Sequence, residues 1–134
     1  MNFTTRPLQE GDAELANQWL DQWKGRQALP ITMYPETGLV LLDENDNEVF
    51  MAFVWVSNSK LMQIGFVTRN PNIKKLPKET RYNFLHDVRR YCYELGAKHL
   101  ITWTNNPLLI EDFKKLGFYE TSNTVSELVI YNLV

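Results

Sequence analysis

A strand–helix–strand unit in the second half of the chain restricts its possible folds more than any other feature. Apolar runs predict strands at Leu61–Thr68 and Lys98–Thr104, and apolar residues at helical spacing predict a helix over Lys78–Leu95. Gly96 stands where a glycine commonly ends a helix. Two strands joined by such a helix are parallel neighbours in one sheet with a right-handed crossover. The remaining elements must be arranged around this parallel pair.

Shorter elements are predicted on both sides of this unit. Residues Gly25–Pro35 contain two prolines and a glycine and are interpreted as a loop or an irregular helix. The pattern predicts strands at Asn2–Arg6, Gly38–Leu42, Glu48–Val56, Phe118–Glu120 and Glu127–Val134, and helices at Asp12–Trp23 and from Pro107 to Gly117. The predicted fold is therefore α/β (α+β), with a mixed, mostly antiparallel central sheet, one parallel strand–helix–strand unit and helices on both faces.

Composition and length favour one globular domain over residues 1–134. The chain is 44% hydrophobic and 22% charged, and no apolar run approaches the roughly 20 residues that span a membrane. The first residues contain no secretion signal, and the single cysteine, Cys92, cannot form an internal disulfide. We therefore expect a cytoplasmic protein, and the two histidines with Cys92 do not form a metal-ligand pattern.

Positive charge is concentrated in residues Arg69–Arg90, which comprise the loop after the first strand of the parallel unit and most of its helix. Half of the 14 basic residues lie there: Arg69, Lys74, Lys75, Lys78, Arg81, Arg89 and Arg90. A helix that begins directly after a basic loop presents free N–H groups and a positive dipole to an anion. A solvated helix face is the alternative interpretation. The net charge of −2 argues against nucleic acid as the partner.

Three pieces of the sequence resemble the Gcn5-related N-acetyltransferase (GNAT) family. Gly65–Pro71 is similar to the family's fourth strand and the start of its acyl-CoA loop, and Leu95–Leu100 to the end of its long helix and its fifth strand. Asn106–Phe118 matches the spacing of the family pattern N-x-x-A-x-x-x-Y-x-x-x-G-F. The pieces occur in the family's order and at its separations, so the chain looks like a divergent GNAT domain.

The resemblance implies acetyl-CoA as co-substrate and a direct attack on its thioester by an acceptor amine. Backbone groups of Phe66, Val67 and Thr68 would pair with the pantetheine arm between two diverging strands. Asn106 would contact the same arm, and Phe113 stands at the position of the family's tyrosine. The pyrophosphate would lie on the loop and helix start, at Lys74, Lys75, Lys78, Glu79, Thr80 and Arg81.

The chain departs from the family pattern at positions that matter for chemistry. The loop Asn72–Arg81 has no glycine where the family has R/Q-x-x-G-x-G/A, and Phe113 cannot protonate a leaving thiolate as a tyrosine would. Leu109 replaces a small residue, and Gln63 stands where a catalytic base is often found. The remaining candidates are the carboxylates Glu36 and Glu48 as base and the phenols Tyr119 and Tyr131 as acid.

Two hypotheses follow from this pattern. The first is an acetyl-CoA-dependent N-acetyltransferase acting on an amine of a small molecule or a protein, and the acidic first 48 residues favour a cationic acceptor. The second is a catalytically silent GNAT-like module that binds acyl-CoA or a protein partner, favoured by the missing glycines and Phe113. Monomer and homodimer both remain open.

Overall fold

The computed structural model describes residues 2–24, 29–122, 128 and 130 of the chain. Its elements, in chain order, are β1 (Thr4–Pro7), α1 (Asp12–Lys24), the 3-10 helix η1 (Ile31–Met33), β2 (Gly38–Leu42), β3 (Glu48–Val56), β4 (Leu61–Arg69), α2 (Lys78–Glu94), β5 (His99–Thr102) and α3 (Pro107–Lys115). None of the described helices is both long and apolar enough to cross a membrane.

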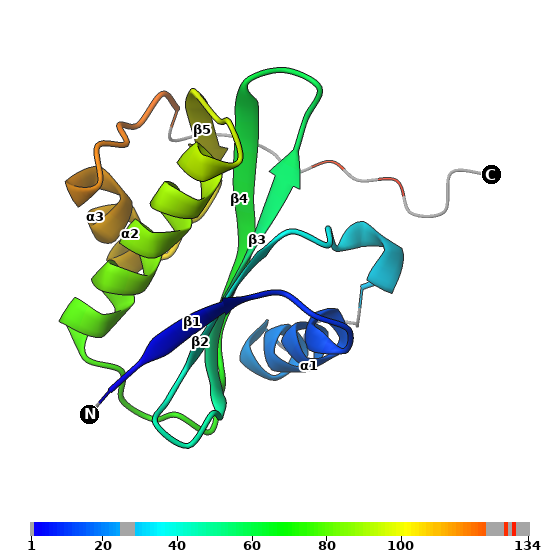
Figure 1. The fold of residues 1–134 in the computed structure, drawn as a ribbon, viewed down its shortest axis with the longest axis vertical. Helices are drawn as coiled ribbons and strands as arrows, with labels where there is room; N and C mark the ends of the chain where they lie inside the picture. The colour runs from blue at the N-terminus through cyan, green and yellow to red at the C-terminus, as the bar shows by residue number, and fades with distance from the viewer. Residues whose placement is uncertain (1, 25–28, 123–127, 129, 131–134) are drawn as a thin grey trace.

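The five strands form one sheet in the order β1-β2-β3-β4-β5. The pairs β1–β2, β2–β3 and β3–β4 are antiparallel, whereas the pair β4–β5 is parallel. Helix α1 covers one face of the sheet, and α2 and α3 cover the other (Figure 1). This arrangement confirms the predicted mixed sheet, its single parallel unit and its helices on both faces.

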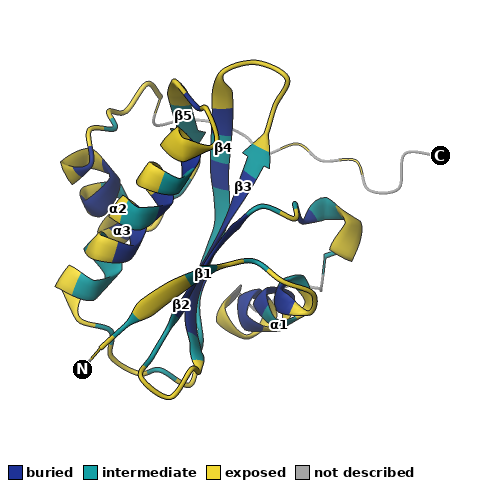
Figure 2. Ribbon diagram, viewed as in Figure 1, coloured by how far each residue is buried: buried dark blue, intermediate teal, exposed yellow. Residues whose placement is uncertain are grey.

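Each face of the sheet has its own hydrophobic core, and β3 contributes to both (Figure 2). Phe53 faces α1, while Ala52 and Val54 face α2, as alternation along a strand requires. The core on the α2 and α3 side also contains Phe84, Leu85, Val88, Leu109 and Phe113, and the α1 side contains Trp19, Leu20, Tyr34, Val40 and Met51. Burial on both faces explains why β3 reads as a continuous apolar run.

A β-bulge interrupts β4 at its midpoint. Met51 pairs with Thr68 and Phe53 with Gly65, so Phe66 and Val67 lie opposite the single residue Ala52. Phe66 has a positive φ of 48°, which is rare for a bulky residue and costs about 1 to 3 kcal/mol. Its ring packs against three aromatic rings of the α1 side, those of Tyr34, Phe53 and Trp55. These contacts offset the backbone strain.

The end of the chain differs from the sequence prediction. Phe118–Glu120 is not a strand, because the N–H of Phe118 donates to the carbonyl of Phe113 and closes the C-terminus of α3. The ring of Phe118 packs on that of Phe113, with centroids 5.0 Å apart. The predicted strand Glu127–Val134 lies largely outside the described residues. In the segment predicted as a loop or irregular helix, the described part contains η1.

Candidate functional site

Strands β4 and β5 pair over only half the length of β4. Leu61–Ile64 pairs with His99–Thr102, and the hydroxyl of Thr102 donates to the carbonyl of Ile64 at 2.8 Å. Beyond this contact, no described strand pairs with Gly65–Arg69 on that side; we call this stretch the open edge of β4 (Figure 1). It includes the bulge at Phe66 and leads directly into the loop before α2.

Three sequence-predicted residues lie on the open edge of β4 with side chains in different surroundings. Phe66 belongs to the aromatic cluster under α1, whereas Val67 packs on the core of the opposite face. Thr68 is buried, and its hydroxyl has no hydrogen-bond partner among the described residues. Among the described strands only β3 pairs with this part of β4, so its backbone polar groups on the β5 side have no strand partner there.

Helix α2 begins at Lys78 with free backbone N–H groups. Pro77 precedes it and supplies no side-chain cap, and the first N–H of the helix with a partner among the described residues is that of Arg81, which donates to the carbonyl of Pro77 at 3.1 Å. The N–H groups of Lys78, Glu79 and Thr80 are the ones a helix start leaves without an intrahelical partner. They provide partial positive charge for an anion even though the loop contains no glycine.

Both bases in the first turn of α2 are paired with acids of α3. The ammonium of Lys78 donates to Glu111 Oε1 at 2.6 Å, and this bond raises the pKa of Lys78 and lowers the pKa of Glu111. The guanidinium of Arg81 donates through Nε to Oδ2 of Asp112. The Lys78 pair is exposed, whereas Asp112 is fully buried.

Lys74 and Lys75 remain as the free cations of this region. Both are exposed on the loop between β4 and α2, and neither forms an ion pair within the described part of the chain. Glu79 and Thr80, on another side of the same helical turn, line a hollow of about 530 Å³ between α2 and β1. The predicted phosphate-binding residues therefore do not all face one point in space.

Helix α3 contributes one polar and one apolar position of the predicted site. Asn106 caps the helix, since its side-chain oxygen accepts from the N–H of Leu108 at 3.0 Å. Phe113 and Leu109 are buried in the core under α2 and α3. Phe113 is thus a packing residue here and has no proton to donate.

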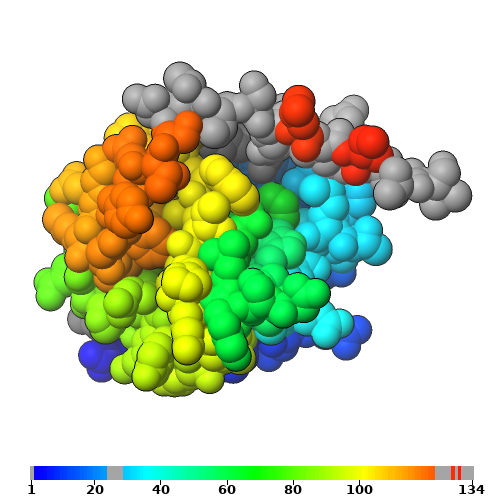
Figure 3. All heavy atoms as spheres, turned by 90° about the horizontal axis from the view of Figure 1, so that it is seen from above, coloured from blue at the N-terminus to red at the C-terminus, as the bar shows by residue number. Residues whose placement is uncertain are grey.

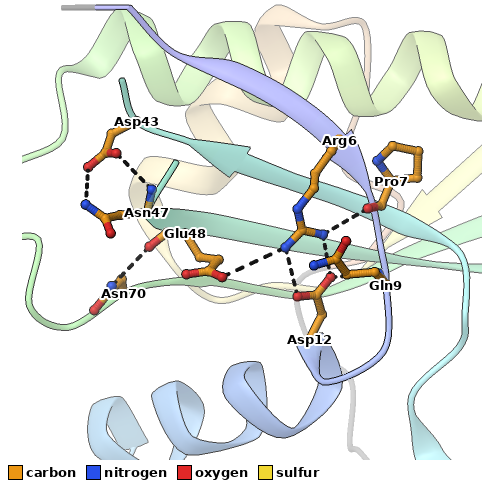
Figure 4. A network of polar contacts seen from close by, with 8 residues as sticks. All are labelled: Arg6, Pro7, Gln9, Asp12, Asp43, Asn47, Glu48 and Asn70. Atoms are coloured by element: carbon orange, nitrogen blue, oxygen red, sulfur yellow. Dashed lines mark hydrogen bonds and ion pairs between the residues drawn. The ribbon is translucent and has the colours of Figure 1, made fainter. Parts of the chain in front are cut away.

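The two carboxylates considered as bases lie at opposite ends of β2. Glu36 is exposed just before the strand begins, whereas Glu48 is paired with Leu42 at its end. Glu48 Oε1 lies 4.0 Å from Arg6 Nη2 in a network centred on Asp12, which Arg6 holds at 2.7 and 3.0 Å (Figure 4). The hydrogen bond to Asp12 raises the pKa of Arg6. The structure does not bring Glu36 and Glu48 together.

Neither Tyr119 nor Gln63 belongs to the open edge of β4. Tyr119 is exposed after α3, and Tyr131 is outside the described residues. Gln63 lines a shallow hollow of about 200 Å³ with Trp55, Ile101 and Trp103. Figure 3 views this end of the molecule, where the β3–β4 hairpin and β5 lie between α3 and the segment around η1.

Solved structures, among them one of an N-acetyltransferase, superpose on almost the whole chain. A glucosamine-6-phosphate N-acetyltransferase from Arabidopsis thaliana matches 96% of this chain and 99% of its own, with a TM-score of 0.64 and 12% identity. AAC(6')-Iy in complex with a CoA bisubstrate analogue matches 98% and 100%, with a TM-score of 0.68 and 13% identity. Rv2747 from Mycobacterium tuberculosis in complex with CoA matches 92% and 76%, with a TM-score of 0.70 and 16% identity. The chain has the GNAT fold.

The GNAT fold was predictable from three short pieces of sequence, yet the overall sequence similarity is low. No protein-family model matches the chain, and no curated protein matches it. At identities of 12 to 16% the likeness to known structures establishes the fold alone. The ligand and the reaction must therefore be argued from this chain's own residues.

Sequence reasoning did not identify the two acids that hold the start of α2. Asp112 stands between Leu109, Phe113 and Leu116 on the buried stripe of α3, where a charge is unexpected. A charged residue at a core position requires a partner of opposite charge, so the aspartate on this apolar stripe indicates a buried ion pair. The identity of the partner, Arg81, depends on how α2 and α3 pack and is not contained in the spacing.

Cys92 is predicted to be unreactive in the native protein. It is buried on α2, and burial raises the pKa of its thiol to about 11. Because the thiolate is the reactive form, a disulfide reagent at pH 8 should label the protein only after urea unfolding. The same shift makes stability fall between about pH 9 and 11, where the unfolded thiol ionises first. Stoichiometric labelling of native protein at pH 8 would contradict this assignment.

Proposed function

We propose that this chain is an acetyl-CoA-dependent N-acetyltransferase whose acceptor is an amine of a small molecule or a protein. The observation that carries the proposal is the open edge of β4, beside which β5 ends at Thr102. An extended pantetheine arm has amide groups that can pair with such a strand edge as another strand would. The free N–H groups at the start of α2 and the unpaired Lys74 and Lys75 suit its phosphates.

The proposed chemistry uses the backbone more than side chains. The acceptor nitrogen attacks the thioester carbonyl, a carbon–nitrogen bond forms, the carbon–sulfur bond breaks and the thiol of CoA leaves. N–H groups near the bulge, at Phe66 to Thr68, would stabilise the negative charge on the carbonyl oxygen. An alkyl ammonium must lose a proton before its nitrogen can attack, and Glu36, Glu48 and solvent are the proposed acceptors for that proton. Tyr119 and Tyr131 remain the proposed donors to sulfur, since Phe113 has none.

A silent acyl-CoA-binding or partner-binding module is the second candidate. The loop without glycine, the pairing of Arg81 with Asp112 and the burial of Phe113 favour it.

Thermal unfolding with acetyl-CoA and a thiol-release assay across an amine panel separate the two candidates. Acetyl-CoA at 100 times its dissociation constant should stabilise the fold by about 2.7 kcal/mol, which raises Tm by several degrees. Absence of any shift at millimolar acetyl-CoA rejects the enzyme and the acyl-CoA-binding module and leaves the partner-binding module, whereas a shift without thiol release favours the silent acyl-CoA binder.

Reversing the two free loop charges is expected to weaken CoA binding. Lys74→Glu with Lys75→Glu replaces attraction to the phosphates by repulsion, and a charge pair near a protein surface contributes about 1 to 4 kcal/mol. We therefore expect the Kd for CoA, measured by calorimetry, to rise at least about tenfold. The control is Lys60→Glu with Lys98→Glu, which makes the same charge change at exposed positions near the other end of β4. An equal rise in the Kd for CoA in the two double variants would show that the loop lysines do not bind the phosphates.

A further inference from the structure

The pairing of Arg81 with Asp112 is unusual because both partners are left incompletely satisfied. Asp112 is fully buried, and its second oxygen, Oδ1, has no hydrogen-bond partner among the described residues. The Nη2 of Arg81 is likewise buried and without a partner there. The pair therefore has the charge of a tight ion pair without the full set of hydrogen bonds that normally accompanies one.

Arg81 belongs to the first turn of α2, next to the proposed phosphate site. It is the fourth residue of α2, directly after the three residues whose N–H groups the helix start leaves free. Its guanidinium is directed to α3, where Asp112 provides a carboxylate in the same neighbourhood. An arginine at this position would be the strongest side-chain contact for a phosphate, since its planar donors match two phosphate oxygens.

The neighbouring pair behaves differently with respect to solvent. Lys78 and Glu111 are about half exposed, so a ligand anion can take the place of Glu111 and leave that carboxylate in water. A ligand that takes Arg81 leaves the Asp112 carboxylate in the interior without a cation. Removing one partner of a buried pair is strongly unfavourable, whereas exposed pairs exchange at little cost. Lys78 is thus more available to a ligand anion than Arg81.

We propose that Asp112 is an affinity-determining residue: it acts as an internal anion that occupies Arg81 and weakens phosphate binding at the start of α2. The inference rests on the proposed function because it concerns the same site. In this proposal the charge of Arg81, the strongest potential phosphate-binding side chain of the region, is neutralised by Asp112 of α3. In the native protein Lys74, Lys75 and the free N–H groups then carry phosphate recognition.

A purely structural tie between α2 and α3 makes a different prediction. In that case removing the charge of Asp112 loosens the helix pair and leaves affinity for anions unchanged or lower. If Asp112 competes with the ligand, removing its charge frees Arg81 and affinity rises. The sign of the change, and its dependence on Arg81, therefore separate the two roles.

The test compares wild type, Asp112→Asn and Asp112→Asn with Arg81→Met, titrated by calorimetry with inorganic pyrophosphate and with CoA. Asparagine preserves the shape of Asp112 and an acceptor oxygen for Arg81. We expect Asp112→Asn to bind pyrophosphate about tenfold more tightly than wild type, and the double variant to lose that gain. Equal affinity in wild type and Asp112→Asn overturns the inference, and so does a gain that persists in the double variant. If Asp112→Asn gains affinity for pyrophosphate while no variant binds CoA more tightly than pyrophosphate, the inference stands and the proposed function fails.

A measurement on the wild-type protein makes the test independent of how the variants fold. The Nε–H resonance of Arg81 should exchange slowly with water and stay in place as pyrophosphate is added up to the concentration that saturates the loop lysines. A shift of this resonance in parallel with the amide of Lys75 would show that Arg81 is available in the native protein, and would overturn the inference.

Discussion

Replacing Arg81 with methionine is expected to lower the free energy of unfolding by about 3 to 5 kcal/mol. The substitution leaves the carboxylate of Asp112 fully buried among apolar residues of α3 without its cation. Adding Asp112→Leu should recover most of the loss, because apolar residues of similar volume replace a buried ion pair at little or no cost. Urea unfolding of the two single variants and the double variant gives the coupling free energy directly.

The matched control for this cycle is Lys78→Met. Lys78 also joins α2 to α3, but its pair with Glu111 is exposed and should contribute at most about 1 kcal/mol. A loss below about 1 kcal/mol for Arg81→Met, similar to that of the control, would show that the buried pair does not hold the two helices together. The difference between the two variants isolates burial, since both remove one base from the same helical turn.

Replacing Gly38 with alanine is the second substitution with a large expected effect. A Cβ atom at Gly38 would lie 2.3 Å from the carbonyl oxygen of Ala52 and 3.1 Å from Cα of Phe53. Both atoms belong to the backbone of β3, which is covered on both faces and cannot move aside without disturbing two cores. We expect a loss of about 3 kcal/mol or more in the free energy of unfolding.

Gly96→Ala is the control for Gly38→Ala, because it introduces backbone strain without steric overlap. Gly96 has a φ of +103°, so alanine is strained there, but a Cβ would meet no atom within 4 Å. The expected cost is about 1 to 2 kcal/mol. Similar losses at Gly38 and Gly96 in urea unfolding would contradict the close approach of β2 to Ala52.

Local rules predicted the parts of the fold in which sequence neighbours determine the structure. The parallel pairing of β4 and β5 followed from strand, helix and strand in succession, and the start of α3 followed from Asn106 and Pro107, a cap and a favoured first residue. The continuous apolar run of β3 predicted a strand covered on both sides. Each of these inferences needed only the pattern within single elements or the order in which the elements follow one another.

The features that sequence could not supply depend on contacts between distant segments. The bulge at Phe66 is supported by three aromatic partners from distant segments, Tyr34 directly after η1 and Phe53 and Trp55 of β3. The positive φ falls on Phe66 and not on the neighbouring Gly65, so the glycine does not mark the position. The capture of Arg81 by Asp112 joins residues 31 positions apart in the chain. The closure of α3 is a local exception, because the N–H of Phe118 donates to the carbonyl of Phe113 and continues the helix end where a strand was predicted. The sequence therefore predicted where the candidate site lies along the chain, but it did not predict which acids pair with the bases of that site.

An amide NMR titration with acetyl-CoA tests the proposed acyl-CoA site most directly. We expect the resonances of Gly65–Thr68 and Lys78–Thr80 to change together and to saturate at one equivalent, because one ligand spans the open edge of β4 and the start of α2. The resonances of the β2–β3 hairpin, residues 43–47, should stay in place. Changes confined to β1 or to the surroundings of Trp103, or none at millimolar acetyl-CoA, would contradict an acyl-CoA site at the diverging strands.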